Sequence, residues 1–280
     1  MRDETFMRWM RLMPKSAVST AVGMATRAPM PVAFHRAAIR AFARRFKVNL
    51  DEAALDVNSF RTFAEFFTRK LKDGARPIDA GDGVIVSPVD GAVSQCGPIT
   101  EGRCVQAKGV DYTVEKLLGD AEAARAFQGG TFATLYLSPR DYHRIHAPLD
   151  GAIEGYAYIP GEFWPVNPAS VRLKDALFCL NERLITYVRT RAGLCAVVKV
   201  GATNVARIRA AYDDVLTHRG QPGKVHRYAN PIPVKKGAEL GVFEMGSTVI
   251  LLFETGRARW DASLVPESVV RMGRRIGEIV

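Results

Sequence analysis

The sequence predicts an α+β fold, with a helical, basic N-terminal region (residues 1–76) before a mainly β catalytic domain of the barrel or sandwich type (residues 77–280). Two observations predict this order. Prolines interrupt helical patterns in the first third of the chain, whereas after Pro77 short β-type runs alternate with Gly, Pro and Asp turns. One turn phrase also occurs twice, which favours two similar hairpin-like halves within the β region.

The N-terminal region is predicted to form several short helices. Three prolines interrupt it: Pro14, Pro29 and Pro31. Residues Val32–Phe46 have apolar side chains at helical spacing, which predicts a helix there. Another helix is predicted over Phe63–Leu71, because Thr62 is followed three residues later by Glu65, the pattern of a capping box.

The β region is predicted from five short apolar runs: Val84–Val86, Thr131–Leu137, Ala152–Tyr158, Leu194–Val200 and Val249–Phe253. The repeated turn phrase is Pro-Val-Asp-Gly at Pro88–Gly91 and Pro-Leu-Asp-Gly at Pro148–Gly151. In both places a small residue and then a β-branched residue follow. This combination predicts a tight turn that leads into a strand.

Positive charge is concentrated at the N-terminus. The whole chain has a net charge of +10, and residues 1–50 hold ten Lys or Arg against two acidic residues, so this segment accounts for +8 of it. Six of the eight Met residues lie in the same segment. Basic side chains mixed with flexible apolar ones suit an anionic membrane surface. A solvated basic helix pair that packs on the domain is the plainer alternative.

No membrane-spanning helix is predicted, so any membrane contact is expected to be peripheral. The longest uncharged stretch near the N-terminus, Ser16–Thr26, is too short to span a bilayer and is rich in Ser, Thr and Gly. Nucleic acid is the other partner that a basic segment can bind. The sequence contains no RNA-type aromatic motif, so no nucleic-acid partner is expected.

Two of the five histidines, His143 and His146, are three residues apart. Such a pair can face one way, as metal binding or paired acid–base chemistry requires, or it can be two structural histidines at a turn. A metal would need a further ligand. Neither a third candidate ligand nor zinc-type cysteine spacing is present, so no metal site is predicted.

Ser247 is a second candidate for chemistry, within Gly246-Ser247-Thr248 at the start of an apolar run. This pattern is weak evidence by itself, because Gly-Ser-Thr is common in plain turns. It is not a G-x-S-x-G nucleophile elbow, since Met245 and Val249 stand where the glycines would be. An ordinary serine hydrolase is therefore the lesser interpretation.

Five segments in sequence order resemble the phosphatidylserine decarboxylase family, and together they cover most of the chain. Phe66–Asp79 is similar to the family's N-terminal signature. Three internal blocks follow: Ser87–Gly91, Tyr142–Pro148 and Trp164–Pro168. Gly246-Ser247-Thr248 is similar to the self-cleavage site. Two positions depart from the usual pattern, since Met245 replaces Leu and Trp164-Pro165 replaces Phe-Ser.

The resemblance implies self-cleavage between Gly246 and Ser247, with Ser247 becoming a covalent pyruvoyl cofactor. His146, oriented by Asp90, is the implied base, and the Ser247 hydroxyl attacks the Gly246 carbonyl to turn the amide into an ester. Elimination then frees residues 1–246, and hydrolysis leaves ammonia and a pyruvoyl group on residues 247–280. The two chains are implied to form a heterodimer, which can itself pair into a dimer.

For activity, the resemblance implies decarboxylation of phosphatidylserine to phosphatidylethanolamine. The pyruvoyl carbonyl forms a Schiff base with the substrate amine. The conjugated system then accepts the electrons left when carbon dioxide departs. His143 is the implied acid that protonates the product, since an imidazole titrates near working pH. Candidates for the substrate pocket are Phe66, Trp164 and Asn167. The resemblance also implies a peripheral enzyme at the cytoplasmic face of the cell (inner) membrane.

The residues leave two other classes of protein open. A conventional serine hydrolase would use Asp90, His146 and Ser247 on an external ester, and its chain would stay whole. A non-catalytic barrel module would use the basic N-terminal segment to bind lipid or nucleic acid. It would have no enzymatic turnover that replacing His143 could abolish. Self-cleavage of the chain distinguishes the family expectation from both.

Overall fold

Three helices, α1–α3, form an N-terminal arm whose breaks fall at prolines. The computed structural model describes residues 2–29, 31–203, 207–218, 220–244 and 248–280. The arm consists of α1 (Arg2–Leu12), α2 (Lys15–Arg27) and α3 (Val32–Phe46). Pro14 and Pro31 take the N-cap positions of α2 and α3, where the missing N–H of proline removes no helical bond. The helix predicted over Val32–Phe46 is confirmed, and no helix among the described residues is long and apolar enough to cross a membrane.

Helix α4 (Phe63–Phe67) begins where the capping box predicts but is shorter than expected. The Thr62 hydroxyl accepts a hydrogen bond from the Glu65 N–H at 3.1 Å, and the Glu65 carboxylate accepts one from the Arg61 N–H at 2.7 Å. The prediction that the helix continues to Leu71 is wrong. Leu71 instead forms an isolated β-bridge with Ala53, which requires extended backbone.

An antiparallel eight-stranded sheet is the centre of the β region. In spatial order its strands are β11 (Lys224–Val234), β7 (Gly151–Ile159), β8 (Arg183–Thr190), β9 (Gly193–Val200), β13 (Thr248–Phe253), β5 (Thr131–Tyr136), β2 (Gly91–Pro98) and β15 (Val269–Val270). Strand β13 lies inside this sheet between β9 and β5, and all six of its residues are buried. Each of the five predicted runs is confirmed as a strand.

Smaller sheets and short helices complete the β region. Three groups of strands are separate from the large sheet: β6 (Arg144–His146) with β12 (Glu239–Phe243) and β10 (Ile208–Ala210), β1 (Val84–Val86) with β16 (Arg275–Ile279) and β14 (Ala258–Trp260), and β3 (Arg103–Ala107) with β4 (Val110–Thr113). The remaining helices are η1 (Val57–Ser59), α5 (Val114–Leu118), α6 (Ala121–Arg125), α7 (Pro168–Leu173) and α8 (Leu177–Leu180). The predicted α+β class, mainly β after an N-terminal helical region, is confirmed.

Both copies of the repeated turn phrase lead into a strand, as predicted. Gly91 opens β2 and Gly151 opens β7. A Cβ at Gly91 would lie 2.3 Å from the backbone oxygen of Tyr136, and a Cβ at Gly151 would lie 2.3 Å from that of Arg189. Glycine is therefore required in both copies because a neighbouring strand passes too close for a side chain. In the first copy this requirement also fixes the position of the adjacent Asp90.

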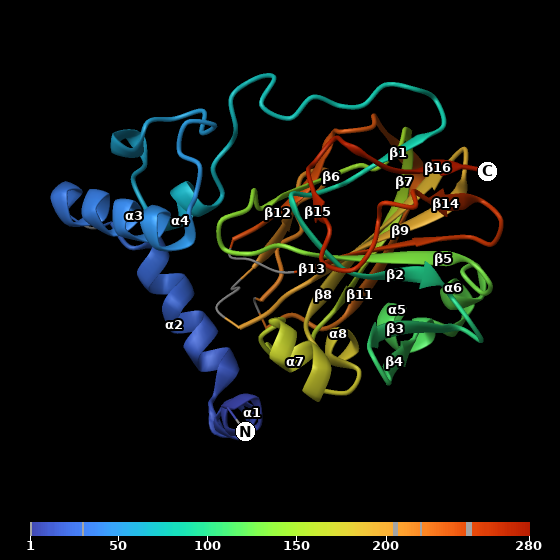
Figure 1. Ribbon diagram of the computed structural model, residues 1–280, viewed down its shortest axis with the longest axis horizontal. Coiled ribbons are helices and arrows are strands. Elements are labelled where there is room, and N and C mark those ends of the chain that lie inside the picture. The colour runs from blue at the N-terminus through green and yellow to red at the C-terminus, as the bar shows by residue number, and fades with distance from the viewer. Residues whose placement is uncertain (1, 30, 204–206, 219, 245–247) are drawn as a thin grey trace.

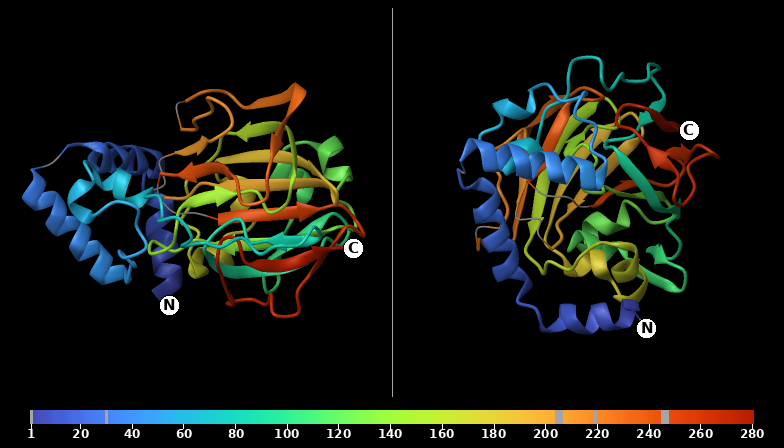
Figure 2. Two further views of the ribbon diagram at one scale, coloured as in Figure 1. Left: turned by 90° about the horizontal axis from the view of Figure 1, so that it is seen from above. Right: turned by 60° about the vertical axis from the view of Figure 1, so that its left-hand side comes forward.

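The N-terminal arm lies beside the strands, as Figures 1 and 2 show, and it shares their hydrophobic core. Met7 and Met10 of α1 belong to the main core, which otherwise consists of side chains from the β region. Ile39 of α3 packs with Phe66 of α4 in a second, smaller core. The arm is thus anchored at both of its ends. The division of the chain between residues 76 and 77 stays a prediction.

Candidate active site

Backbone hydrogen bonds bring the turn that carries Asp90 next to the strand that carries the two histidines. His143 lies directly before β6, and His146 is the last residue of β6. The N–H of His146 donates to the carbonyl oxygen of Pro88 at 2.9 Å, two residues before Asp90. The N–H of Phe243 in β12 donates to the carbonyl oxygen of His143 at 2.9 Å. Three of the predicted site residues therefore lie in one region of the fold.

Both imidazoles are held through Nδ1. That atom of His143 lies 2.8 Å from the carbonyl oxygen of Asp141, and that of His146 lies 2.8 Å from the carbonyl oxygen of Gly237. A carbonyl oxygen only accepts, so each Nδ1 carries the proton and each Nε2 presents a lone pair. Both Nε2 atoms are buried without a hydrogen-bond partner among the described residues. Because buried polar atoms are normally paired, these two are candidates for proton transfer.

Burial favours the neutral form of both histidines. It lowers the pKa of His143 to about 3, and the positive charge of Arg69 adds to the shift. Burial also lowers the pKa of His146, although the hydrogen bond to Gly237 and the negative charge of Asp90 oppose the effect. Both imidazoles are therefore neutral at pH 7, the form in which Nε2 can accept a proton.

Aromatic rings enclose the two histidines. The ring of Phe67 in α4 lies against His143, with centroids 4.1 Å apart, and Tyr142 stacks on His146 with centroids 5.6 Å apart. Arg144 fixes this arrangement, because its guanidinium donates both to the carbonyl oxygen of Thr68, at the end of α4, and to the carboxylate of Glu239. The N-terminal region therefore supplies one wall of the site.

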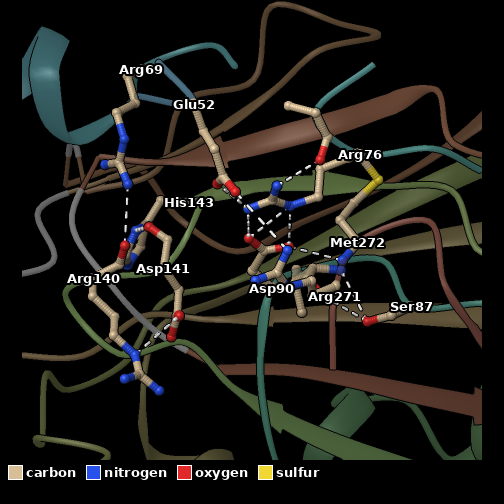
Figure 3. Close-up of polar contacts among 12 residues, drawn as sticks. Glu52, Arg69, Arg76, Ser87, Asp90, Arg140, Asp141, His143, Arg271 and Met272 are labelled. Atoms are coloured by element: carbon tan, nitrogen blue, oxygen red, sulfur yellow. Dashed lines mark hydrogen bonds and ion pairs between the residues drawn. The ribbon is translucent and has the colours of Figure 1, made fainter. Parts of the chain in front are cut away.

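Asp90 belongs to a buried charge network, drawn in Figure 3. The guanidinium of Arg76 donates to both carboxylate oxygens of Asp90, at 2.6–3.0 Å, and also to Glu52 at 2.8 Å. The N–H of Met272 donates to Asp90 at 2.9 Å. Arginine thus neutralises these acids, and the described part of the chain contains no group of three or more His, Cys, Asp or Glu side chains placed to hold a metal ion.

His146 has a different orienting partner from the one that the resemblance implies. The Gly237 carbonyl holds its Nδ1, and Arg76 and the Met272 N–H hold the Asp90 carboxylate. No hydrogen bond joins Asp90 to His146 in the described segments. Burial lowers the pKa of His146 and the charge of Asp90 opposes this shift, so the aspartate acts on the imidazole through space.

The predicted cleavage site, Gly246 and Ser247, lies outside the described residues, but both of its flanks lie inside. On the upstream side, Glu244 is ion-paired with Arg27 of α2 at 3.1 Å. On the downstream side, Thr248 opens β13 and is paired with strands β5 and β9. Residue 247 therefore directly precedes a central strand of the large sheet.

A cavity of about 340 Å³ adjoins Thr248. Tyr136 of β5 lines it together with Val166 and Val171 from the segment that includes α7. Its volume is within the range of pockets that hold small molecules. The cavity is therefore large enough for a small molecule.

The three substrate-pocket candidates have structural roles in the described residues. Phe66 is fully buried in the smaller hydrophobic core. Trp164 is buried in the main core, and the Lys15 ammonium lies 4.0 Å from its ring centroid. Asn167 caps α7 by accepting a hydrogen bond from the Ser170 N–H at 2.9 Å. Their contact with a substrate stays a prediction.

Sequence reasoning assigned no role to Arg76 or to Gly237, which hold Asp90 and His146. Arg76 is part of the segment that resembles the family's N-terminal signature, so its place there could have drawn attention to it. Gly237 acts through its carbonyl oxygen, which every residue has. No signal in the sequence could have indicated that contact.

The fold is of the α+β class, and it holds two buried histidines, one directly before β6 and one at its end. The chain belongs to the phosphatidylserine decarboxylase family, because the model of that family matches residues 63–278. A protein of Myxococcus xanthus (strain DK1622) is 66% identical over 279 residues, which cover 100% of both chains. One of Anaeromyxobacter sp. (strain K) is 55% identical over 280 residues, and one of Azotobacter vinelandii is 44% identical over 284, each covering 99% of both chains. All three are named phosphatidylserine decarboxylase proenzyme.

Proposed function

We propose that this chain decarboxylates phosphatidylserine to phosphatidylethanolamine, after cutting itself between Gly246 and Ser247 and converting Ser247 into a pyruvoyl group. The observation that carries the proposal is the pair of buried, unpartnered Nε2 atoms of His143 and His146, which provides one base for each reaction. The names of the relatives support both parts, because they specify the decarboxylase and a proenzyme.

In the cleavage reaction, Nε2 of His146 takes the proton of the Ser247 hydroxyl while Oγ attacks the carbonyl carbon of Gly246. The amide becomes an ester. Loss of the Cα proton and cleavage of the Cβ–Oγ bond then release residues 1–246 as a carboxylate, and hydrolysis of the remaining enamine gives the pyruvoyl group and ammonia. The neutral state of His146 and its fixed Nδ1 support this role, since the imidazole must accept a proton through Nε2.

Strand pairing supports a heterodimer that persists after cleavage. The new chain of residues 247–280 would begin directly before β13, whose six residues are paired with β5 on one side and β9 on the other. The same chain contains β16, which pairs with β1. The larger chain supplies β1, β5 and β9, so separation would break these three strand pairings, which lie in two sheets. Pairing of two such heterodimers is part of the proposal.

The cavity that adjoins Thr248 supports a pyruvoyl group on the residue that precedes it in the sequence. When present, this group supplies an electron sink for decarboxylation. His143 is assigned proton transfer with the substrate. Its Nε2 must carry a proton to deliver to the substrate carbon, and because burial lowers the pKa of His143, that proton is readily released once present. Phe67 covers His143 and excludes water from this exchange.

The test of this proposal is the intact mass of purified wild-type chain together with carbon dioxide release from phosphatidylserine. We expect two chains, of 246 and 34 residues, with a pyruvoyl group at the start of the shorter one. A Ser247→Ala variant prepared in parallel is expected to remain one chain of 280 residues. A wild-type chain that stays whole after incubation with lipid would overturn the proposal and favour the hydrolase and binding-module alternatives.

The proposed location is the cytoplasmic face of the cell (inner) membrane, with the N-terminal arm as the contact. Five large apolar side chains of the arm are exposed: Trp9, Leu12, Met24, Val32 and Phe34. They occur together with the basic residues that give residues 1–50 a charge of +8. Apolar groups that enter the headgroup region and cations that meet anionic lipids are the two components of peripheral membrane binding.

Replacing Trp9, Leu12 and Phe34 together with serine is expected to weaken binding to phosphatidylglycerol vesicles by at least about tenfold, since three exposed apolar side chains are lost. Sedimentation with the vesicles measures the bound fraction. The matched control replaces three exposed valines of the β region, Val105, Val225 and Val265, and should bind as the wild type does. Equal weakening in both triple variants would contradict the assignment to the arm.

A further inference from the structure

The turn before β12 holds His146 through several backbone contacts. The carbonyl oxygen of Gly237 lies 2.8 Å from Nδ1 of the imidazole. The N–H of Gly237 donates to the carbonyl oxygen of Ala147 at 2.8 Å, and the N–H of Ala147 donates to that of Ala238 at 2.8 Å. Residues 237–238 are therefore fixed relative to the histidine, and so is the strand that follows them.

Two features outside these contacts keep the turn in place. Gly237 has a φ of +80°, and a Cβ there would lie 2.7 Å from Cδ1 of Ile78, so glycine is required. Asp150, the acid of the second Pro-x-Asp-Gly phrase, accepts a hydrogen bond from the N–H of Lys236 at 2.8 Å. The turn is thus anchored on both sides before β12 begins.

Glu239, the first residue of β12, lies directly opposite His146 in the antiparallel pairing with β6. Side chains of directly opposed residues share one face, with Cβ atoms roughly 5 Å apart. Arg144, two residues before His146 in β6, projects from the same face. Its Nη1 donates to both carboxylate oxygens of Glu239, at 2.8 and 2.9 Å. This arrangement places the Glu239 carboxylate beside the imidazole.

Glu239 is the negative charge that acts most strongly on His146. Burial lowers the pKa of this histidine, and the largest opposing effects are the hydrogen bond to Gly237 and the charge of Glu239. The positive charge of Arg144 lowers the pKa by less than Glu239 raises it, and the effect of Asp90 is smaller still. Glu239 therefore favours the imidazolium more than Asp90 does.

The other ionisable side chains around His146 are already paired or neutral. Asp90 is bound through both carboxylate oxygens by Arg76, as Figure 3 shows. Tyr142 stacks on the imidazole, and because burial raises its pKa to about 12, the phenol is uncharged at pH 7. The ammonium of Lys236 donates to the carbonyl oxygen of Gly81 at 2.9 Å. The pair of Glu239 and Arg144 is thus the charged group nearest to the imidazole along its own strands.

We propose that Glu239 is a positioning residue for self-cleavage, whose carboxylate stabilises the imidazolium formed when His146 takes the proton of Ser247. The inference rests on the proposed function, because it concerns the base of the proposed cleavage. The Gly237 carbonyl already binds Nδ1, and Nε2 must stay open for the serine, so the carboxylate acts through space. A fixed opposite charge beside a charge that develops in the transition state lowers the barrier.

The first test is the titration of His146 in the uncut Ser247→Ala chain, followed by NMR of the imidazole. Its signal is identified as the one that His146→Gln removes. Adding Glu239→Gln is expected to lower the pKa of His146, because the amide can still accept from Arg144 but carries no charge. Glu239→Asp keeps the charge and should retain most of the original pKa.

The matched control for the titration is Glu154→Gln. Glu154 of β7 is ion-paired with Arg189 at 2.9 Å, much as Glu239 is with Arg144 at 2.8 Å, and the two carboxylates have comparable exposure, 37% and 29%. This control removes the same charge from another sheet. It should leave both the titration of His146 and the rate of self-cleavage unchanged.

The second test is the rate of self-cleavage in newly synthesised chains, measured by mass spectrometry at successive times. Glu239→Gln is expected to cut roughly 3- to 30-fold more slowly than the wild type, the effect of losing one partly neutralised charge beside a base. The acid limb of its pH–rate profile should move to lower pH, because a lower pKa keeps His146 deprotonated further into acid. General damage to the fold would slow cleavage without moving that limb.

Decarboxylation distinguishes this role from a structural one. Once processed, Glu239→Gln should release carbon dioxide from phosphatidylserine with a kcat within about threefold of the wild type, because His143 is assigned to that reaction and is held by the Asp141 carbonyl. Equal losses of cleavage and decarboxylation would therefore overturn the inference. An unchanged pKa of His146, an equal change with Glu154→Gln, or cleavage at the wild-type rate would do the same while cleavage of the wild type stands. A wild type that stays whole and releases no carbon dioxide would instead overturn the proposed function.

Discussion

Replacing His146 with glutamine is expected to leave the chain almost uncut, with self-cleavage slowed by roughly 10²- to 10⁴-fold, the contribution of one positioned base. Glutamine is close to histidine in size and still offers an amide N–H to the carbonyl of Gly237. It cannot accept a proton at the position of Nε2, which is the buried, unpaired atom of the wild type. The mass spectrum at successive times after purification gives the cleavage rate directly.

His143→Gln is expected to behave in the opposite way. Its chain should cut as the wild type does, while carbon dioxide release from phosphatidylserine falls by roughly 10²- to 10⁴-fold. The control is His226→Gln, a histidine of β11 in the large sheet, whose ring lies 5.3 Å from that of Tyr156, and neither reaction should change. If the two active-site variants lose both reactions to the same extent, the division of roles between His143 and His146 is wrong.

The sequence predicted most of the architecture because its signals are local. The prolines at 14 and 31 stand at the starts of helices, and the two Pro-x-Asp-Gly phrases open strands because glycine is needed where a neighbouring backbone passes. The end of α4 could not be predicted in this way. Leu71 leaves the helix for a bridge with Ala53, which is a contact between two separate segments.

The chemistry of the site was predictable in its residues but not in its connections. His143, His146 and Asp90 stand out by type and by family resemblance, whereas the partners that hold them are a backbone carbonyl at Gly237 and the side chain of Arg76. A carbonyl carries no residue identity, and an arginine in a basic, apparently exposed signature gives no sign that it will be buried. The first contact arises when the turn before β12 packs on β6, and the second when the N-terminal region closes over the turn at Asp90.

Lys199 is a further residue whose environment cannot be predicted from the sequence. Its burial predicts that replacing it changes the stability of the protein. In the sequence it interrupts an apolar run that predicts a strand, and in the structure it is fully buried in β9, directly opposite Val249 of β13. Among the described residues, its ammonium donates only to the hydroxyl of Thr186 and, at 3.4 Å, to the carbonyl oxygen of Val197. Burial lowers its pKa from 10.5 to about 7, because neither of these partners carries a negative charge.

Lys199→Met is therefore expected to stabilise the protein by roughly 2–4 kcal/mol at pH 7, an apolar side chain replacing a poorly solvated amine. The Thr186 hydroxyl keeps a partner in the variant, since it also bonds with the hydroxyl of Tyr212. Urea unfolding of the Ser247→Ala chain, with and without the second substitution, measures the difference on one uncut polypeptide. The control is Lys235→Met, an exposed lysine, which should change stability little.

The lowered pKa of Lys199 also predicts how the stability difference changes with pH. Between about pH 7 and 10.5 the unfolded chain binds a proton at Lys199 that the folded chain does not, so this lysine makes the wild type more stable as pH rises through that interval. Below about pH 7 both states are protonated and the full penalty is present. The advantage of Lys199→Met should accordingly be largest at or below pH 7 and shrink toward pH 10, while groups common to both proteins cancel in the difference. Two outcomes would contradict this prediction: a Lys199→Met variant that is less stable than the wild type at pH 7, or a difference in unfolding free energy that does not change with pH. Either would show that the fold stabilises the charged lysine by contacts other than those with its described partners.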